Sequence, residues 1–188
     1  CDPPEVAIVL HAAATLRFGA RDRLFASLVP HAREHQGTFS ARHLAVCFHA
    51  AARVGFRDEL FCQLVATRFT KDFASIDALA LTSAVYACGL LAFFDKPLFE
   101  AVAAFLCRVL GDERRSLEPQ QVSNIIYTFG KLSFCPEPAL TAATQHAMDD
   151  LWRFKPQELD NLTYGLALLK FRHEPYLARL SQHLVEGG

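Results

Sequence analysis

The chain has 188 residues, a formal net charge of −1 and a hydrophobic content of 52%. The near-zero net charge counts against a simple polyanion-binding surface. Its cations are mostly arginine, 14 against 5 lysines. Because arginine can both pair with phosphate and stack on a base, a modest number placed on one face could still suffice for contact with a polyanion.

Five similar segments follow one another along the chain, and each closes on a phenylalanine. They cover residues 6–18, 44–56, 81–93, 122–134 and 159–171, so the closing phenylalanine recurs at intervals of 38, 37, 41 and 37 residues. A fixed period of this size is typical of helical solenoids and other repeat arrays. The longest interval contains the charged string "GDERRS" at 111–116, which we expect to form a loop.

Each segment predicts an amphipathic helix. In the second one, Leu44, Phe48 and Ala51 recur at helical spacing. We expect each helix to begin just after the residue placed four positions before its first apolar residue, and the first three of these residues are good N-caps. These residues are Asp2, Ser40, Asp77, Glu118 and Lys155. A short turn and a second apolar run follow each closing phenylalanine, so the repeating unit is helix, turn, helix.

The predicted fold is therefore an all-α, right-handed α-solenoid of about five helical hairpins. We expect one continuous domain, because no linker interrupts the register. Its units cover residues 2–38, 39–75, 76–116, 117–153 and 154–186. Neither terminal unit is polar on all sides, so we expect the ends to dock on other proteins, on RNA or on further repeats.

Two stretches superficially suggest other classes of protein. The uncharged segment Ala78–Phe94 has 17 residues, at the lower limit for crossing a bilayer. Its register with the other first helices favours a buried repeat helix and no membrane insertion. The string "HAREH", His31–His35, fits a zinc-protease pattern, but no third ligand is identified, and we expect a solvated helix end.

No catalytic motif is present, so we expect no enzyme activity, no cofactor and no metal site. Glycine-rich phosphate loops and nucleophile elbows are absent from the sequence, and the adjacent Asp149 and Asp150 would point in different directions on a helix. The cysteines form no CxxC pair and predict small buried hydrophobic residues in a reducing compartment. They are Cys1, Cys47, Cys62, Cys88, Cys107 and Cys135.

The back of the first helices forms a separate surface, about 140° to 200° around the helix from Leu44. We call it the first-helix stripe. It comprises Pro4, Ile8, His11, Thr15, Arg42, Val46, His49, Arg53, Leu79, Ser83, Tyr86, Leu90, Gln120, Asn124, Tyr127, Lys131, Gln157, Asn161, Tyr164 and Leu168. The candidate RNA-binding residues are Arg42, His49, Arg53, Tyr86, Gln120, Asn124, Tyr127, Lys131, Gln157, Asn161 and Tyr164.

The stripe carries a ring in every segment, and two interpretations of these rings stay open. Planar side chains beside amides and cations suit stacking on unpaired bases. The rings could equally pack sideways against neighbouring helices with their polar tips in water. Asn124 and Asn161 are unfavourable within a helix and call for a partner, either RNA or an asparagine on the next helix.

Small residues also recur at one position of the repeat, where we expect neighbouring helices to approach closely. They are Ala14, Ala52, Gly89, Gly130 and Ala167.

The segments "LTSAVYACGLLAF", "VSNIIYTFGKLSF" and "LDNLTYGLALLKF" resemble the helical repeats of RAP-domain and FASTK-like proteins, also called heptatricopeptide repeats and related to the octotricopeptide class. The resemblance implies a soluble organellar RNA-binding protein, mostly mitochondrial, acting in transcript processing or as part of a mitochondrial ribosome. Its ligand would be organellar rRNA or mRNA. The chain shows no RAP segment and no PPPEW motif, so we expect neither nuclease-like activity nor a literal base-reading code.

The sequence therefore predicts a non-catalytic RNA-binding component of an organellar ribonucleoprotein. The alternative is a protein–protein scaffold of the tetratricopeptide kind within a large organellar complex, which the near-zero net charge favours.

Overall fold

The structure is a computed structural model that describes residues 2–16, 19–112 and 117–186. This part of the chain is all-helical and contains no strand. The first helices of the five hairpins are α1 (Pro3–Thr15), α3 (Ala41–Arg53), α5 (Ala78–Leu90), α7 (Pro119–Lys131) and α9 (Pro156–Leu168). The second helices are α2 (Arg21–Glu34), α4 (Glu59–Lys71), α6 (Lys96–Leu110), α8 (Glu137–Asp149) and α10 (Glu174–Glu186). The predicted helical-repeat fold is confirmed.

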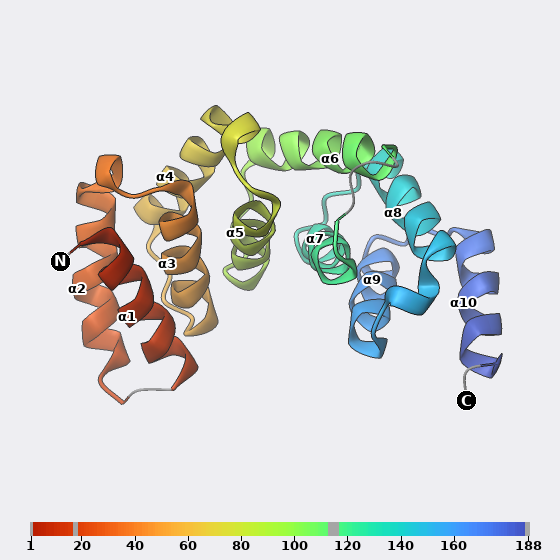
Figure 1. Ribbon diagram of the computed structural model, residues 1–188, viewed down its shortest axis with the longest axis horizontal. Coiled ribbons are helices and arrows are strands. Elements are labelled where there is room, and N and C mark those ends of the chain that lie inside the picture. Colours follow the sequence, from red (N-terminus) through yellow and green to blue (C-terminus); the bar gives the residue numbers. More distant parts are fainter. Residues whose placement is uncertain (1, 17–18, 113–116, 187–188) are drawn as a thin grey trace. The chain divides into compact units, whose positions relative to one another are not determined.

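The chain divides into two compact units, Cys1–Leu98 and Phe99–Gly188. Figure 1 shows α1, α3 and α5 side by side in the first unit, and α7 beside α9 in the second, and direct contacts join these neighbours. Continuity of the whole array and its right-handed sense stay predictions.

The first helices begin where the capping residues predicted. Within α3 and α5, the backbone N–H groups of His43 and Ala80 donate to the side chains of Ser40 (3.2 Å) and Asp77 (2.8 Å). Lys155 cannot accept such a bond. There the cap is made in reverse, because the Lys155 N–H donates to the Glu158 carboxylate at 2.8 Å.

The first helices end in a shared backbone turn that explains the closing phenylalanine. The residue before it adopts a left-handed conformation in four repeats: Gly55 (φ 75°), Ala92 (φ 51°), Ser133 (φ 55°) and Lys170 (φ 54°). The phenylalanine N–H then donates back to the helix, for example from Phe134 to the Phe129 carbonyl at 2.9 Å. This is the six-to-one bond of a Schellman cap, which places an apolar side chain back against the helix. Phe18 and the loop residues 113–116 lie outside the described residues.

A closing phenylalanine packs against other aromatic rings in each unit. In the second unit the Phe134 ring lies 5.2 Å from Phe129 and 5.9 Å from Phe99, centroid to centroid. In the first unit Phe56 packs against Phe25 at 6.0 Å. In the described part of the chain, three short 3₁₀ helices that the repeat pattern does not predict precede the next first helix. They are Gln36–Thr38, Phe73–Ser75 and Leu151–Arg153.

Candidate nucleic-acid interface

In the first unit the stripe runs over α1, α3 and α5. Arg42 and Arg53 are exposed at opposite ends of α3, and His11 is exposed on the neighbouring α1. The Arg53 guanidinium donates to the Thr15 hydroxyl at 3.2 Å, a bond that joins the stripe residues of α1 and α3. The structure therefore brings these sequence-predicted cations beside the rings of one surface.

A groove of about 570 Å³ lies on this part of the stripe, between α1 and α3. Its lining includes Ile8, His11, Arg42 and Val46. Of these four residues, only Arg42 is one of the candidate RNA-binding residues. The candidate set contains no residue of α1, because the stripe positions of this helix are mostly non-polar. The groove depends on the pairing of two helices that lie 38 residues apart in the chain, which composition alone does not reveal.

The ring positions of α3 and α5 contact each other. The His49 and Tyr86 rings are half-buried and meet edge to face, with centroids 5.9 Å apart. Burial lowers the pKa of His49 below 6.5, and the nearby charges of Arg53 and His11 lower it further. His49 is therefore neutral at pH 7 and offers the stripe a ring and a hydrogen-bonding nitrogen, not a positive charge.

In the second unit the stripe runs over α7 and α9. The Tyr127 and Tyr164 rings lie 6.1 Å apart at an interplanar angle of 30°. Tyr127 is half-buried, whereas Tyr164 is 54% exposed. Sideways packing between neighbouring helices is thus present in both units, and Tyr164 keeps much of its ring open to a ligand.

The amides of the stripe take different environments. Asn161 accepts a hydrogen bond from Gln157 at 3.2 Å, one turn earlier on the same helix. The hydrogen-bond partner of Asn161 is therefore Gln157 on its own helix, and not Asn124 on the neighbouring helix. Asn124 is half-buried, while Gln120 and the cation Lys131 are exposed near the two ends of α7.

No residue of the stripe is acidic, although the chain as a whole carries 20 Asp and Glu against 19 Lys and Arg. The stripe holds Arg42, Arg53 and Lys131 as its cations. The stripe positions themselves therefore carry positive and neutral groups, while the exposed Asp160 lies beside Tyr164, one turn earlier on α9.

Close helix approach is confirmed where the stripe helices of the second unit meet. A Cβ atom built on Gly130 would lie 2.6 Å from the carbonyl oxygen of Gly165. Gly130 is one of the recurring small residues. Its partner Gly165 lies two positions before the small position of its own helix and was not singled out. Ala167, which occupies that position in α9, is exposed.

The cysteine prediction is correct in part. Cys47, Cys62 and Cys88 are buried, and burial raises the pKa of Cys47 to about 12 and of Cys62 to about 11. Cys135 is exposed and Cys107 half-buried, which corrects the expectation for these two residues. Both lie outside the densely packed positions of the first helices. Cys1 lies outside the described residues.

The remaining motifs find ordinary structural roles. The His31 and His35 rings lie 4.3 Å apart at the end of α2, and His35 Nδ1 contacts the His31 carbonyl at 2.9 Å. Within residues 2–16, 19–112 and 117–186, no three His, Cys, Asp or Glu side chains are grouped as metal ligands. Among these same residues, none of the helices combines the length and apolar character needed to span a bilayer.

The fold and the stripe define a class: a helical-repeat protein whose first helices display cations, amides and rings at the stripe positions. Residues 3–180 match the family model described as RNA-editing substrate-binding complex 6 protein. The chain belongs to this family. The match does not confirm the finer resemblance to RAP-domain and FASTK-like proteins. No curated protein matches the chain.

Proposed function

We propose that this chain is a non-catalytic RNA-binding subunit of a mitochondrial assembly that holds RNA-editing substrates. The observation that carries the proposal is the carboxylate-free stripe with Arg42, Arg53 and Lys131 beside exposed rings, in a family described by the binding of such substrates. The family description favours RNA processing over the ribosomal role.

Contact with RNA follows from the chemistry of the stripe in each unit. Phosphates pair with the exposed cations Arg42, Arg53 and Lys131. Unpaired bases stack on the accessible rings of His11 and Tyr164. In the first unit, the groove between α1 and α3 is large enough for a base, with His11 and Arg42 both in its lining. These contacts read single-stranded RNA through stacking and charge, with little base specificity.

A protein scaffold is the second candidate, and the stripe itself carries the observation that favours it. Ile8, Leu79 and Leu90 are exposed at stripe positions of the first unit, and Leu168 is exposed at a stripe position of the second. Apolar side chains interleaved with arginine and tyrosine are also typical of the core of protein–protein interfaces.

The experiment that separates the two candidates is single-stranded RNA binding at two salt concentrations. The variant replaces Arg42, Arg53 and Lys131 with alanine. The matched control replaces Arg23, Lys71 and Arg179, which are exposed off the stripe and change the net charge equally. We expect the stripe variant to bind more weakly and to lower the salt slope by about 2, at about 0.7 for each phosphate contact. Equal RNA affinity of the stripe and control variants would favour the protein scaffold over the RNA-binding subunit.

A further inference from the structure

The connection between α8 and α9 carries a tryptophan that the packing of the fold does not use. Trp152 is the one tryptophan of the chain, and it is 78% exposed. It stands in the middle of the short 3₁₀ helix Leu151–Arg153, next to the buried Leu151. A large ring left in water contributes little to folding, so the role of Trp152 lies at the surface.

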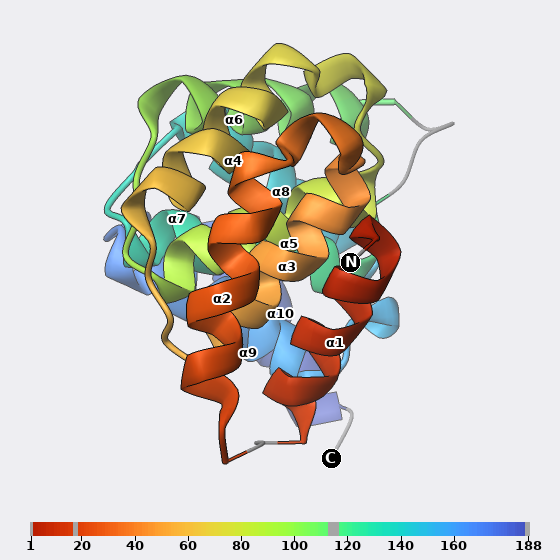
Figure 2. The same cartoon turned by 90° about the vertical axis from the view of Figure 1, so that its left-hand side faces the viewer.

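The same position is small in the two other repeats whose 3₁₀ helix is described. It is Gly37 before α3 and Ala74 before α5, and both residues are exposed. A Cβ atom built on Gly37 meets nothing within 4 Å, although two further first helices follow it in the first unit. In Figure 2 the connection from α2 to α3 runs along the outside of that unit. The position is therefore open even where further repeats follow, and Trp152 is an addition to the repeat.

A cation follows Trp152 three residues later, at the capping position of α9. The residues at this position in the other repeats are acidic or polar: Asp2, Ser40, Asp77 and Glu118. A positive charge at the start of a helix opposes the helix dipole, so Lys155 does not stabilise α9 through its charge. Lys155 is exposed. The fold thus gains nothing from either the ring or the cation of this connection.

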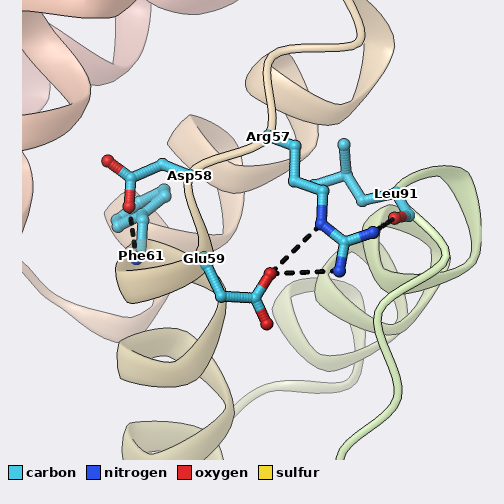
Figure 3. A network of polar contacts seen from close by, with 5 residues as sticks. All are labelled: Arg57, Asp58, Glu59, Phe61 and Leu91. Atoms are coloured by element: carbon cyan, nitrogen blue, oxygen red, sulfur yellow. Dashed lines mark hydrogen bonds and ion pairs between the residues drawn. The ribbon is translucent and has the colours of Figure 1, made fainter.

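A cation at another hairpin connection shows the contrast. Arg57 donates to the Glu59 carboxylate at 3.0 Å and 3.2 Å, and to the Leu91 carbonyl at 2.8 Å (Figure 3). These bonds tie the turn before α4 to the end of α5. The guanidinium of Arg57 is therefore used within the fold.

The arginine beside Trp152 is used in the same way. Arg153 is half-buried, and its guanidinium lies 3.2 Å from the Asp150 carboxylate and 3.7 Å from that of Glu118. Lys155, by contrast, forms no ion pair within the described part of the chain. Of the two cations that follow Trp152 in the connection, Lys155 is the one available to an anionic ligand.

The residues around the ring in this connection decide what kind of ligand fits. The exposed residues within five positions of Trp152 are Asp149, Lys155, Pro156 and Gln157. Of these, only the proline is apolar. The core of a protein interface gathers several apolar side chains around its anchor residue. A nucleobase needs one open ring, with a cation close by for the phosphate. The connection therefore favours single-stranded RNA over a protein partner.

We propose that Trp152 and Lys155 form a nucleotide-binding site, in which a base of single-stranded RNA stacks on the Trp152 ring and its phosphate pairs with the Lys155 ammonium. This inference rests on the proposed function and extends the stripe of the second unit. The first stripe residue of α9, Gln157, is exposed and follows Trp152 by five positions, at most about 18 Å along the chain. One strand can therefore contact both the ring and the stripe of α9.

The test uses the emission of Trp152, which reports on this site alone because the chain has no second tryptophan. The probe is a short single-stranded oligoadenylate. Its binding is followed by the anisotropy of a label on the RNA and, with unlabelled RNA, by tryptophan emission. We expect quenching of the emission, with the same midpoint as the anisotropy, because the stacked base contacts the ring directly.

Variants separate the contributions of the ring and the cation. Trp152→Ala should weaken binding by about 5- to 150-fold, the loss of one stacked base, and Trp152→Phe should recover most of that loss. Lys155→Gln should lower the salt slope by about 0.7, for one phosphate contact. Leu60→Ala removes an exposed apolar side chain from α4 and serves as the control. Thermal melts should be unchanged in each variant, because these side chains are exposed.

The possible failures are distinguishable. Unquenched emission and an unchanged affinity of Trp152→Ala would overturn the nucleotide site and favour a protein contact for the ring. The proposed function survives that result if the stripe variant of Arg42, Arg53 and Lys131 still binds RNA more weakly. A wild-type chain that does not bind the oligonucleotide would overturn both.

Discussion

Gly165 tests how closely two first helices approach in the second unit. A Cβ atom at this position would lie 2.5 Å from the carbonyl oxygen of Ile126 and 2.8 Å from the backbone nitrogen of Tyr127. Ordinary contact begins near 3.4 Å, so Gly165→Ala requires a separation of about 0.9 Å between α7 and α9. The obstructing atoms belong to a helix backbone and cannot rotate away, and the whole interface must open.

The magnitude follows from two opposing effects. Overpacking of this kind costs about 3 kcal/mol, the upper part of its usual range, because no side chain can yield. Replacing a helical glycine with alanine returns about 1 kcal/mol of helix propensity. We therefore expect Gly165→Ala to lower the free energy of unfolding by about 2 kcal/mol, and the melting temperature by about 4 to 8 °C.

The assay is thermal and urea unfolding followed by circular dichroism, with Gly37→Ala as the control. A Cβ atom at Gly37 meets nothing within 4 Å, so this variant should match the wild type or be slightly more stable. If Gly165→Ala were as stable as Gly37→Ala, the helices would not be in the tight contact described, and the reasoning from small residues to close approach would fail.

Three further predictions concern the thiols, the histidines and the helix ends. Under native conditions a thiol reagent should modify Cys135 rapidly and spare Cys47 and Cys62, whose raised pKa values reflect burial; rapid labelling of all cysteines would contradict this. Burial is the main cause of the lowered pKa values of His49 and His146. As the pH falls, these histidines therefore bind protons in the unfolded chain at a higher pH than in the folded chain. The free energy of unfolding should fall as the pH drops below about 6.5. Replacing His49 with glutamine should flatten that dependence in pH-resolved melts. Lys170→Gly should raise the free energy of unfolding by about 1 kcal/mol, because its φ of 54° strains a side chain; an unchanged urea midpoint would argue against strain there.

The sequence was sufficient to place the helices because their signals are local. Ser40 and Asp77 cap the helices that they were expected to cap. The left-handed turn at the helix end was not predicted, because Gly55 is the one residue among these four whose type favours a positive φ. Ala92, Ser133 and Lys170 adopt the same conformation without that signal. There the N–H of the following phenylalanine donates back to the helix, from Phe93 and Phe134 at 2.9 Å and from Phe171 at 3.0 Å, a backbone bond that residue type does not reveal.

The stripe could be placed on one face from helical periodicity, but its contacts could not. Which ring meets which depends on how far apart two helices pack, and this distance is set by pairs such as Gly130 and Gly165. The exposure of Ala167 has a similar origin, since the position is buried in α1, α3 and α7 by the helix that follows each of them. A position's environment in a repeat array thus depends on its neighbouring repeat as much as on its own residue.

The two tyrosines of the second unit separate packing from RNA contact. Their rings lie side by side, but Tyr164 is exposed, at 54%, whereas Tyr127 is less exposed than Tyr164. A base can stack on the open ring, and the covered ring supports it from the side. Tyr164→Ala should therefore weaken RNA binding by about 1 to 3 kcal/mol with little change in melting temperature. Tyr127→Ala should lower the melting temperature and leave most of the affinity per folded molecule. If Tyr164→Ala binds RNA as the wild type does, the ring only packs, and the stacking role of the stripe fails.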